Sequence, residues 1–147
     1  FLIAPNPGEG LKPLAKIASG GETSRLMLAL KNTLAEADSI PSMIFDEIDQ
    51  GIGGRVGSIV GEKLWLLSRN HQILCITHLP QLAAYYDVHF HVSKQLSDGR
   101  TRTLVKQLQP EESLREMAQL MGGDSPENRR ASGAMILNAQ KWKESVK

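Results

Sequence analysis

The chain has 147 residues, of which 41% are hydrophobic and 22% are charged, and its formal net charge is +1. This composition is typical of a globular domain with one hydrophobic core, and the near-neutral charge excludes a polycationic chain that binds nucleic acid by charge alone. No apolar run approaches the roughly 20 residues of a membrane-spanning helix, so we expect no membrane partner.

The first predicted elements are a loop over residues 5–20, rich in proline and glycine, and a helix over residues 21–37. At their junction lies the sequence Ser19-Gly20-Gly21-Glu22. A helix N-terminus carries backbone N–H groups without intrahelical partners and the positive end of the helix dipole, so it suits phosphate, and Ser19 could add a hydroxyl donor. The alternative is an ordinary helix N-cap, for which serine and glycine are equally suitable.

A predicted strand over residues 42–46 ends in two adjacent carboxylates, Asp46 and Glu47, with Asp49 two residues later. The end of a buried strand is where polar side chains first leave the core, and neighbouring residues there point in opposite directions. Asp46 suits a Mg²⁺ ion that is also held by substrate phosphates, and Glu47 could orient or deprotonate a water molecule. The alternative is a polar strand end that runs into a loop.

A helix is predicted over residues 54–69 and a second buried strand over residues 72–77, which contains the single cysteine and ends at His78. A neutral imidazole in that place could contact a γ-phosphate or the attacking water, although a structural role is the alternative. Cys75 cannot form an internal disulfide, which predicts a buried thiol in a reducing compartment. The glycines at positions 51, 53, 54 and 57 miss dinucleotide-binding spacing and predict a flexible loop at a subunit interface.

The remaining elements are a helical turn over residues 80–84, a hairpin whose second strand covers residues 101–108, and helices over residues 111–121 and 126–143. Alternating strands and helices predict an α/β fold, a mostly parallel sheet flanked by helices with the hairpin at one edge. We interpret the other conspicuous residues as solvated or structural rather than as DNA or metal contacts: Lys94, Arg100, Arg102, Lys106, Arg129 and Arg130, and the histidines His89 and His91.

The order of these motifs resembles the second half of an ATP-binding-cassette (ABC) ATPase head. Ser19-Gly20-Gly21-Glu22 resembles the signature motif, residues 43–47 the Walker B strand, Asp49 the D-loop and His78 the switch histidine. Within that superfamily, the sequences of residues 16–22, 45–54 and 76–81 resemble those of the RecN family of bacterial double-strand-break repair proteins, relatives of the structural-maintenance-of-chromosomes (SMC) ATPases. The resemblance covers essentially the whole chain, from residues 6–9 to residues 121–123, and Thr23 and Gln50 are its visible departures.

This resemblance implies that residues 1–147 are the C-terminal lobe of an ATPase head. The chain contains no Gly-x-x-x-x-Gly-Lys-Ser/Thr motif, since residues 57–63 have the wrong spacing. We therefore expect the N-terminal Walker A lobe and a coiled coil elsewhere in the same protein, and this chain alone to be inactive.

The roles that the resemblance implies involve ATP and Mg²⁺ between two heads of a homodimer. Asp46 is expected to serve the metal, and Glu47 and His78 to be catalytic toward the nucleotide of their own head. The signature residues and Asp49 are expected at the partner's nucleotide and at the interface between heads. The complete protein is expected to bind DNA in the cytoplasm, in association with the nucleoid. Two alternatives stay open: a docking lobe without turnover, and the head of another chromosome-type ATPase.

Overall fold

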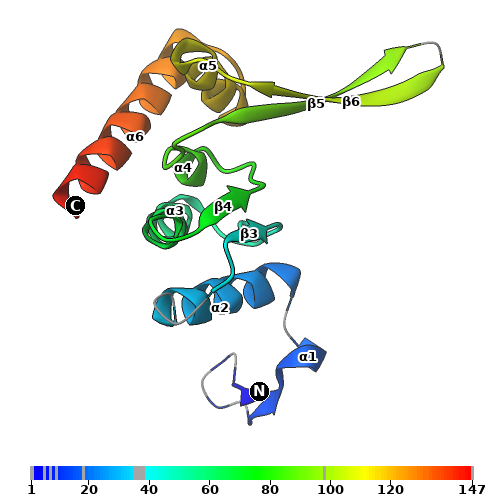
Figure 1. Ribbon diagram of the computed structural model, residues 1–147, viewed down its shortest axis with the longest axis vertical. Coiled ribbons are helices and arrows are strands. Elements are labelled where there is room, and N and C mark those ends of the chain that lie inside the picture. The colour runs from blue at the N-terminus through cyan, green and yellow to red at the C-terminus, as the bar shows by residue number, and fades with distance from the viewer. Residues whose placement is uncertain are drawn as a thin grey trace.

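The computed structural model describes residues 2–4, 6, 8, 10–17, 19–34, 39–97 and 99–146. The described part forms three two-stranded sheets and six α-helices. Figure 1 shows these elements stacked along one long axis, with the N-terminal elements at one end and the last two helices at the other. Within this part no helix is both long and apolar enough to cross a membrane.

The N-terminal elements differ from the predicted loop over residues 5–20. Strand β1 (Leu2–Ile3) pairs antiparallel with β2 (Lys12–Pro13), and the one-turn helix α1 (Leu14–Ile17) follows directly. A proline is tolerated in such a short, two-stranded pair because an edge position does not require its missing N–H. The prediction is therefore wrong for residues 12–17 and for Gly20, while Pro5, Pro7, Glu9 and Ala18 lie outside the described residues.

Helix α2 (Gly20–Thr33) begins with a capping box. The hydroxyl of Ser19 accepts a hydrogen bond from the Glu22 N–H (3.2 Å), and the Glu22 carboxylate accepts one from the Ser19 N–H (2.8 Å). The N-cap interpretation of Ser19 is thus confirmed, because both partners satisfy backbone groups that the helix leaves unpaired. The helix ends at Thr33 with Leu34 as its C-cap, so the predicted range is wrong at Leu34, and residues 35–37 lie outside the described residues.

A parallel strand pair lies at the centre of the molecule. Strand β3 (Ser42–Phe45) pairs with β4 (Gln72–Cys75), and helix α3 (Gly54–Ser68) connects them. One face of the pair packs on α2 and α3 in a hydrophobic core that contains Leu28, Met43, Phe45, Ile48, Val60, Leu64, Leu67 and Leu82.

The opposite face of this strand pair is open in the described chain. Ile44, Leu74 and Ile76 are 71%, 48% and 59% exposed, and on α3 the apolar residues Val56 and Ile59 are also exposed. The prediction of two fully buried strands is therefore wrong for one face. Alternation along a strand places successive side chains on opposite faces, so a single covering layer buries only every second residue.

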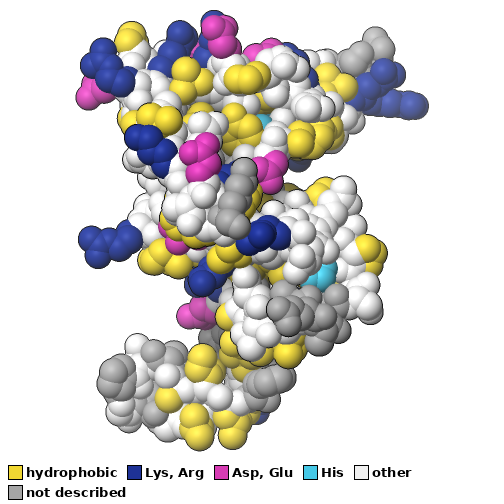
Figure 2. Space-filling view, turned by 60° about the vertical axis from the view of Figure 1, so that its left-hand side comes forward, with side chains coloured by type: hydrophobic (Ala, Val, Ile, Leu, Met, Phe, Trp, Pro, Cys, Tyr) yellow, Lys and Arg dark blue, Asp and Glu magenta, His cyan; other side chains and the backbone are white. Residues whose placement is uncertain are grey.

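The hairpin is confirmed as β5 (Phe90–Ser97) and β6 (Arg100–Gln107), with Val92 opposite Val105, although Asp98 in its turn lies outside the described residues. It forms a sheet of its own instead of the edge of the parallel pair, and it projects sideways from the helices (Figure 1). Nζ of Lys106 on β6 lies 2.5 Å from Oε1 of Glu112, which belongs to the next helix along the chain. On the face in view, Figure 2 shows lysine and arginine side chains scattered rather than gathered in one patch.

The C-terminal helices agree closely with their predicted ranges. They are α4 (Pro80–Ala83), α5 (Pro110–Leu120) and α6 (Pro126–Ser145). Ser125 is the N-cap of α6, and its hydroxyl accepts a hydrogen bond from the Asn128 N–H (3.1 Å). The Trp142 ring of α6 makes edge-on contacts with the ring of Trp65 on α3 (5.8 Å between ring centroids) and with that of Tyr85, which follows α4 (5.6 Å). The hairpin, α5 and α6 therefore extend the molecule beyond the core around β3 and β4.

Candidate functional site

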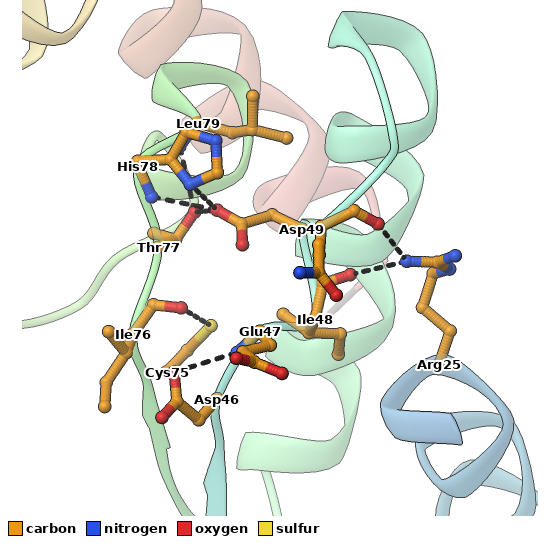
Figure 3. Close-up of polar contacts among 11 residues, drawn as sticks. Arg25, Asp46, Glu47, Ile48, Asp49, Cys75, Ile76, Thr77, His78 and Leu79 are labelled. Atoms are coloured by element: carbon orange, nitrogen blue, oxygen red, sulfur yellow. Dashed lines mark hydrogen bonds and ion pairs between the residues drawn. The ribbon is translucent and has the colours of Figure 1, made fainter. Parts of the chain in front are cut away.

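The predicted site residues lie at the carboxyl ends of the two parallel strands. Phe45 lies opposite Cys75, and the Ile76 N–H donates to the Phe45 carbonyl (2.9 Å), so both strands end at the same edge. The segment from Asp46 to Asp49 leaves β3 there, and His78 follows β4 (Figure 3). Carboxyl ends of strands in parallel sheets are where α/β proteins place their ligands.

Asp49 and His78 are in direct contact. The Asp49 side chain is 4% exposed, and its Oδ2 atom lies 3.0 Å from Nδ1 of His78. The same oxygen accepts hydrogen bonds from the Thr77 hydroxyl (2.6 Å) and from the His78 N–H (2.8 Å). Burial tends to raise the pKa of Asp49, but the bonds from Thr77 and His78 outweigh it and hold that pKa below its ordinary value.

This contact determines which ring nitrogen of His78 is available for chemistry. A carboxylate beside Nδ1 favours a proton on that atom, which leaves Nε2 as the acceptor of the neutral ring. The His78 side chain is 73% exposed, so Nε2 can meet a ligand. Asp49 thus contacts the histidine of its own chain, and its place at the interface between heads stays a prediction.

Asp46 and Glu47 both lie on the surface. The Oδ1 atom of Asp46 accepts a hydrogen bond from the Glu47 N–H (2.9 Å), and Glu47 has a left-handed backbone conformation with φ +57°. Such conformations are uncommon for residues other than glycine, and they cluster at functional sites. The carboxylate of Glu47 points to the start of α2, where its Oε2 lies 2.5 Å from the position that a Cβ atom would take at Gly20.

The glycines at the start of α2 make a close approach possible. A Cβ atom at Gly21 would lie 2.8 Å from the carbonyl oxygen of Gln50, so Gly21 leaves no room for a side chain. At Gly20 the near atom belongs to the movable end of the Glu47 side chain. Glu22 is occupied by the capping box, and the hydrogen bonds from the Ser19 N–H and hydroxyl lower its pKa. Ser19 and Glu22 therefore cap α2, and Gly20 and Gly21 let it approach the turn that follows β3.

Two further residues make this junction, and neither was predicted from the sequence: Ser24 and Arg25. Arg25 donates from Nη1 to the carbonyl oxygens of Ile48 (3.1 Å) and Gln50 (2.9 Å), and the Ser24 hydroxyl donates to that of Asp46 (3.1 Å). Helical spacing could have found both, because Ser24 and Arg25 lie four residues after Gly20 and Gly21 and so share their faces of the helix.

Two of the glycines that predicted a flexible loop are helical and pack closely. A Cβ atom at Gly54 would lie 3.2 Å from Nε2 of Gln81, and one at Gly57 would lie 3.2 Å from Cδ1 of Leu79. Both glycines therefore let α3 approach the segment that follows His78, and the prediction is wrong for them. Gly51 has a positive φ of 74° and does lie in a turn.

The site can supply one carboxylate ligand, Asp46, to a Mg²⁺ ion whose other ligands are water and phosphate. In the described part of the chain no group of three or more His, Cys, Asp or Glu side chains could hold a metal ion. Mg²⁺ commonly takes one or two protein carboxylates and completes its shell with water and phosphate oxygens, so the exposed Asp46 suffices. Burial, with the charges of Asp49 and Asp46, raises the pKa of the Cys75 thiol to about 12, which keeps it from acting as a ligand.

No protein-family model matches the chain. Among solved structures, the fold is similar to a chain from a study of ATP-driven dimerisation and DNA-stimulated activation of SMC ATPases. The TM-score is 0.53 at 23% sequence identity, over 82% of this chain and 79% of that one. The fold is therefore that of an α/β lobe of the ABC-type head found in SMC ATPases.

Among curated proteins, the chain is similar to DNA repair proteins named RecN. It is 49% identical to the one from Bacillus subtilis over 84% of this chain, 46% to one from Xylella fastidiosa over 95%, and 48% to the one from Treponema pallidum over 85%. The chain belongs to the RecN family and matches its C-terminal end. It spans only 21% to 26% of the length of these relatives.

Proposed function

We propose that this chain is the C-terminal lobe of the ATPase head of a RecN-type DNA repair protein, which hydrolyses ATP with Mg²⁺ once its head is complete. One observation carries the proposal: Asp46, Glu47 and the Asp49–His78 pair lie together at the ends of two parallel strands. The relatives' name, DNA repair protein RecN, supports the same function. The same name argues against the alternative that this chain is part of the head of another chromosome-type ATPase.

Each acidic residue has a separate role in this proposal. Asp46 would hold Mg²⁺, and the ion would supply charge neutralisation at the phosphates of ATP. Glu47 orients the attacking water and accepts its proton, and its exposed carboxylate can turn from Gly20 toward that water. His78 presents Nε2 to the γ-phosphate or the water, and Asp49 holds the ring from the other side.

A complete site requires two further partners. The Walker A lobe belongs to another part of the same protein, and the open apolar face formed by Ile44, Leu74 and Ile76 is a surface that such a lobe can cover. A second copy of the head contributes the other half of the site. In that homodimer the segment from Ser19 to Glu22 faces the nucleotide of the partner, because a helix N-terminus attracts phosphate.

DNA binding belongs to the complete protein in this proposal. Figure 2 shows no single basic patch on the face in view, and the net charge of the chain is +1. ATP-driven closing and opening of the heads would act on DNA through the rest of the protein. We place the complete protein in the cytoplasm, in association with the nucleoid.

The test compares three forms of the complete protein: wild type, Glu47→Gln and, as a matched control, Glu144→Gln on the exposed side of α6. We expect Glu47→Gln to reduce ATP turnover at least about 100-fold, because the amide cannot accept a proton, and to accumulate an ATP-bound dimer. Glu144→Gln should keep wild-type turnover. Unchanged turnover in Glu47→Gln would refute the role of Glu47, and a wild type that binds DNA without turnover would favour the docking lobe.

A further inference from the structure

The first two turns of α2 hold the backbone of the turn that follows β3. Ser24 binds the carbonyl oxygen of Asp46 (3.1 Å), and Arg25 binds those of Ile48 (3.1 Å) and Gln50 (2.9 Å). These three carbonyls alternate with Glu47 and Asp49 along the chain. Figure 3 shows the guanidinium of Arg25 reaching from α2 to this turn. Two side chains of one helix therefore fix the backbone on both sides of each acidic residue.

Close packing makes this junction stiff. The turn approaches α2 so closely that a Cβ atom at Gly21 would lie 2.8 Å from the Gln50 carbonyl oxygen and 2.9 Å from Nη1 of Arg25. On the other side of the turn, Asp49 is anchored to Thr77 and His78. A shift of α2 must therefore move the loop from Asp46 to Gln50, because packed groups of this kind do not deform independently. Movement of that loop shifts Asp49 and, through it, His78.

The junction joins the start of α2 to the turn after β3, and in the proposed function these two parts serve different nucleotides. The inference rests on that proposed function. The start of α2 faces the nucleotide bound to the partner head. The turn from Asp46 to Asp49 serves the nucleotide of its own head. Arg25 lies between them, with its backbone in α2 and its guanidinium on the turn.

We propose that Arg25 is a positioning residue that links the two nucleotide sites of the head dimer. Nucleotide contact at Ser19 to Glu22 sets the position of α2, and Arg25 transmits that position to the backbone around Glu47 and Asp49. Each site then hydrolyses ATP fully only when the other is occupied. Arg25 touches neither nucleotide in this account, so it controls the rate of hydrolysis and its cooperativity rather than the affinity for ATP.

The experiment uses the complete protein with three substitutions: Arg25→Gln, Arg25→Lys and, as a control, Arg130→Gln on the exposed surface of α6. Steady-state ATP turnover yields kcat, KM and the Hill coefficient for ATP. A second measurement follows ATP-dependent dimer formation of Arg25→Gln in the Glu47→Gln background, where hydrolysis is blocked. Thermal unfolding of each variant reports whether the fold is kept.

We expect Arg25→Gln to lower kcat about 10- to 100-fold, the range typical of residues that orient catalytic groups, with KM changed less than about threefold. Its Hill coefficient should fall from above 1 in the wild type to about 1, while the ATP-dependent dimer still forms. Arg25→Lys should recover part of kcat, because an ammonium group can reach one of the two carbonyls. Arg130→Gln should match the wild type.

Some results would overturn this inference and leave the proposed function intact. One is a wild-type kcat and Hill coefficient in Arg25→Gln, and another is a wild type that hydrolyses ATP without cooperativity. Loss of the ATP-dependent dimer together with a lowered melting temperature would also overturn it, since Arg25 would then only hold the fold. A wild-type protein with no ATP turnover would refute the proposed function itself.

Discussion

The carboxylate of Asp49 holds both the ring and the backbone of His78, with Oδ2 3.0 Å from Nδ1 and 2.8 Å from the backbone nitrogen. One buried oxygen thus fixes where the histidine sits and which ring nitrogen carries the proton. This resembles the way in which hydrolases orient a catalytic imidazole with a buried carboxylate.

Asp49→Asn should lower the ATP turnover of the complete protein about 10- to 100-fold with little change in KM. The amide keeps the shape of the side chain, but it lacks the negative charge that favours a proton on Nδ1 of His78. Steady-state kinetics measures the effect. Glu144→Gln is the control, and an Asp49→Asn protein with wild-type kcat would show that the pair is only structural.

The stability contribution of Asp49 should depend on pH with a definite sign. Its pKa is lower in the folded chain, so the ionised form stabilises the fold above the ordinary aspartate pKa of about 4. That stabilisation is lost as the pH falls through the lowered folded-state pKa. We expect wild type to exceed Asp49→Asn by about 1–3 kcal/mol in unfolding free energy near pH 7, and this difference to be smaller at pH 3. Denaturant unfolding at both pH values measures this, and a constant difference would contradict it.

Gly20→Ala and Gly21→Ala should differ in their effect on stability. At Gly20 the new methyl group meets the exposed end of the Glu47 side chain, which can turn away, so we expect a change within about 0.5 kcal/mol. At Gly21 it meets the backbone oxygen of Gln50, which cannot move alone, so we expect a loss of about 1–3 kcal/mol. Thermal unfolding of both variants compares them, and equal losses would show that the Glu47 carboxylate is held as firmly as the Gln50 backbone.

Cys75 should react slowly with thiol reagents. Burial, with the nearby charges of Asp49 and Asp46, raises its pKa to about 12, and only the thiolate attacks such reagents. At pH 7.5 we expect alkylation by iodoacetamide to be at least roughly 100-fold slower than that of free cysteine. Mass spectrometry over time measures the rate. Rapid modification of the folded protein would show that the edge of the strand pair opens readily.

His89 should make the fold less stable in mild acid. Burial, opposed by Glu116 and assisted by His91, lowers the pKa of His89 below its ordinary value of 6.5. The unfolded chain then binds more protons between the folded-state pKa and about 6.5, so stability falls as the pH drops through 6.5. His89→Gln should reduce the loss of melting temperature between pH 7.5 and pH 5.5. An equal loss in both proteins would assign the acid sensitivity to another group.

Much of the fold was predictable because its determinants are local. The capping box needs only Ser19 and Glu22 at a spacing of three, and the end of α5 needs only the glycines at 122 and 123, which adopt positive φ values of 106° and 141°. The hairpin likewise follows from alternating residues on both sides of a turn. Such patterns are read within a few residues, so the ranges of α3, α5 and α6 agree with the structure to within a few residues.

The parts that were not predictable depend on contacts between distant residues. Whether the hairpin joins the parallel pair or stands as a separate sheet depends on neighbours that alternation along one strand does not specify. Contacts between distant residues likewise decide which face of β3 and β4 is covered. The expectation of buried strands was wrong at Ile44 and Ile76 for this reason.

The sequence by itself determined the order of the motifs, the α/β alternation and the chemical types at the site: a glycine-rich helix start, three carboxylates and a histidine. Only the tertiary structure decided that Asp49 holds His78, that Glu47 adopts a left-handed conformation over Gly20, and that Arg25 binds the turn after β3. The hydrogen bond from the His78 N–H to Asp49 spans 29 residues, and those of Arg25 span 23 and 25. Local periodicity places a side chain on a face of its own helix or strand, but the alignment of β3, β4 and α2 decides what that face meets.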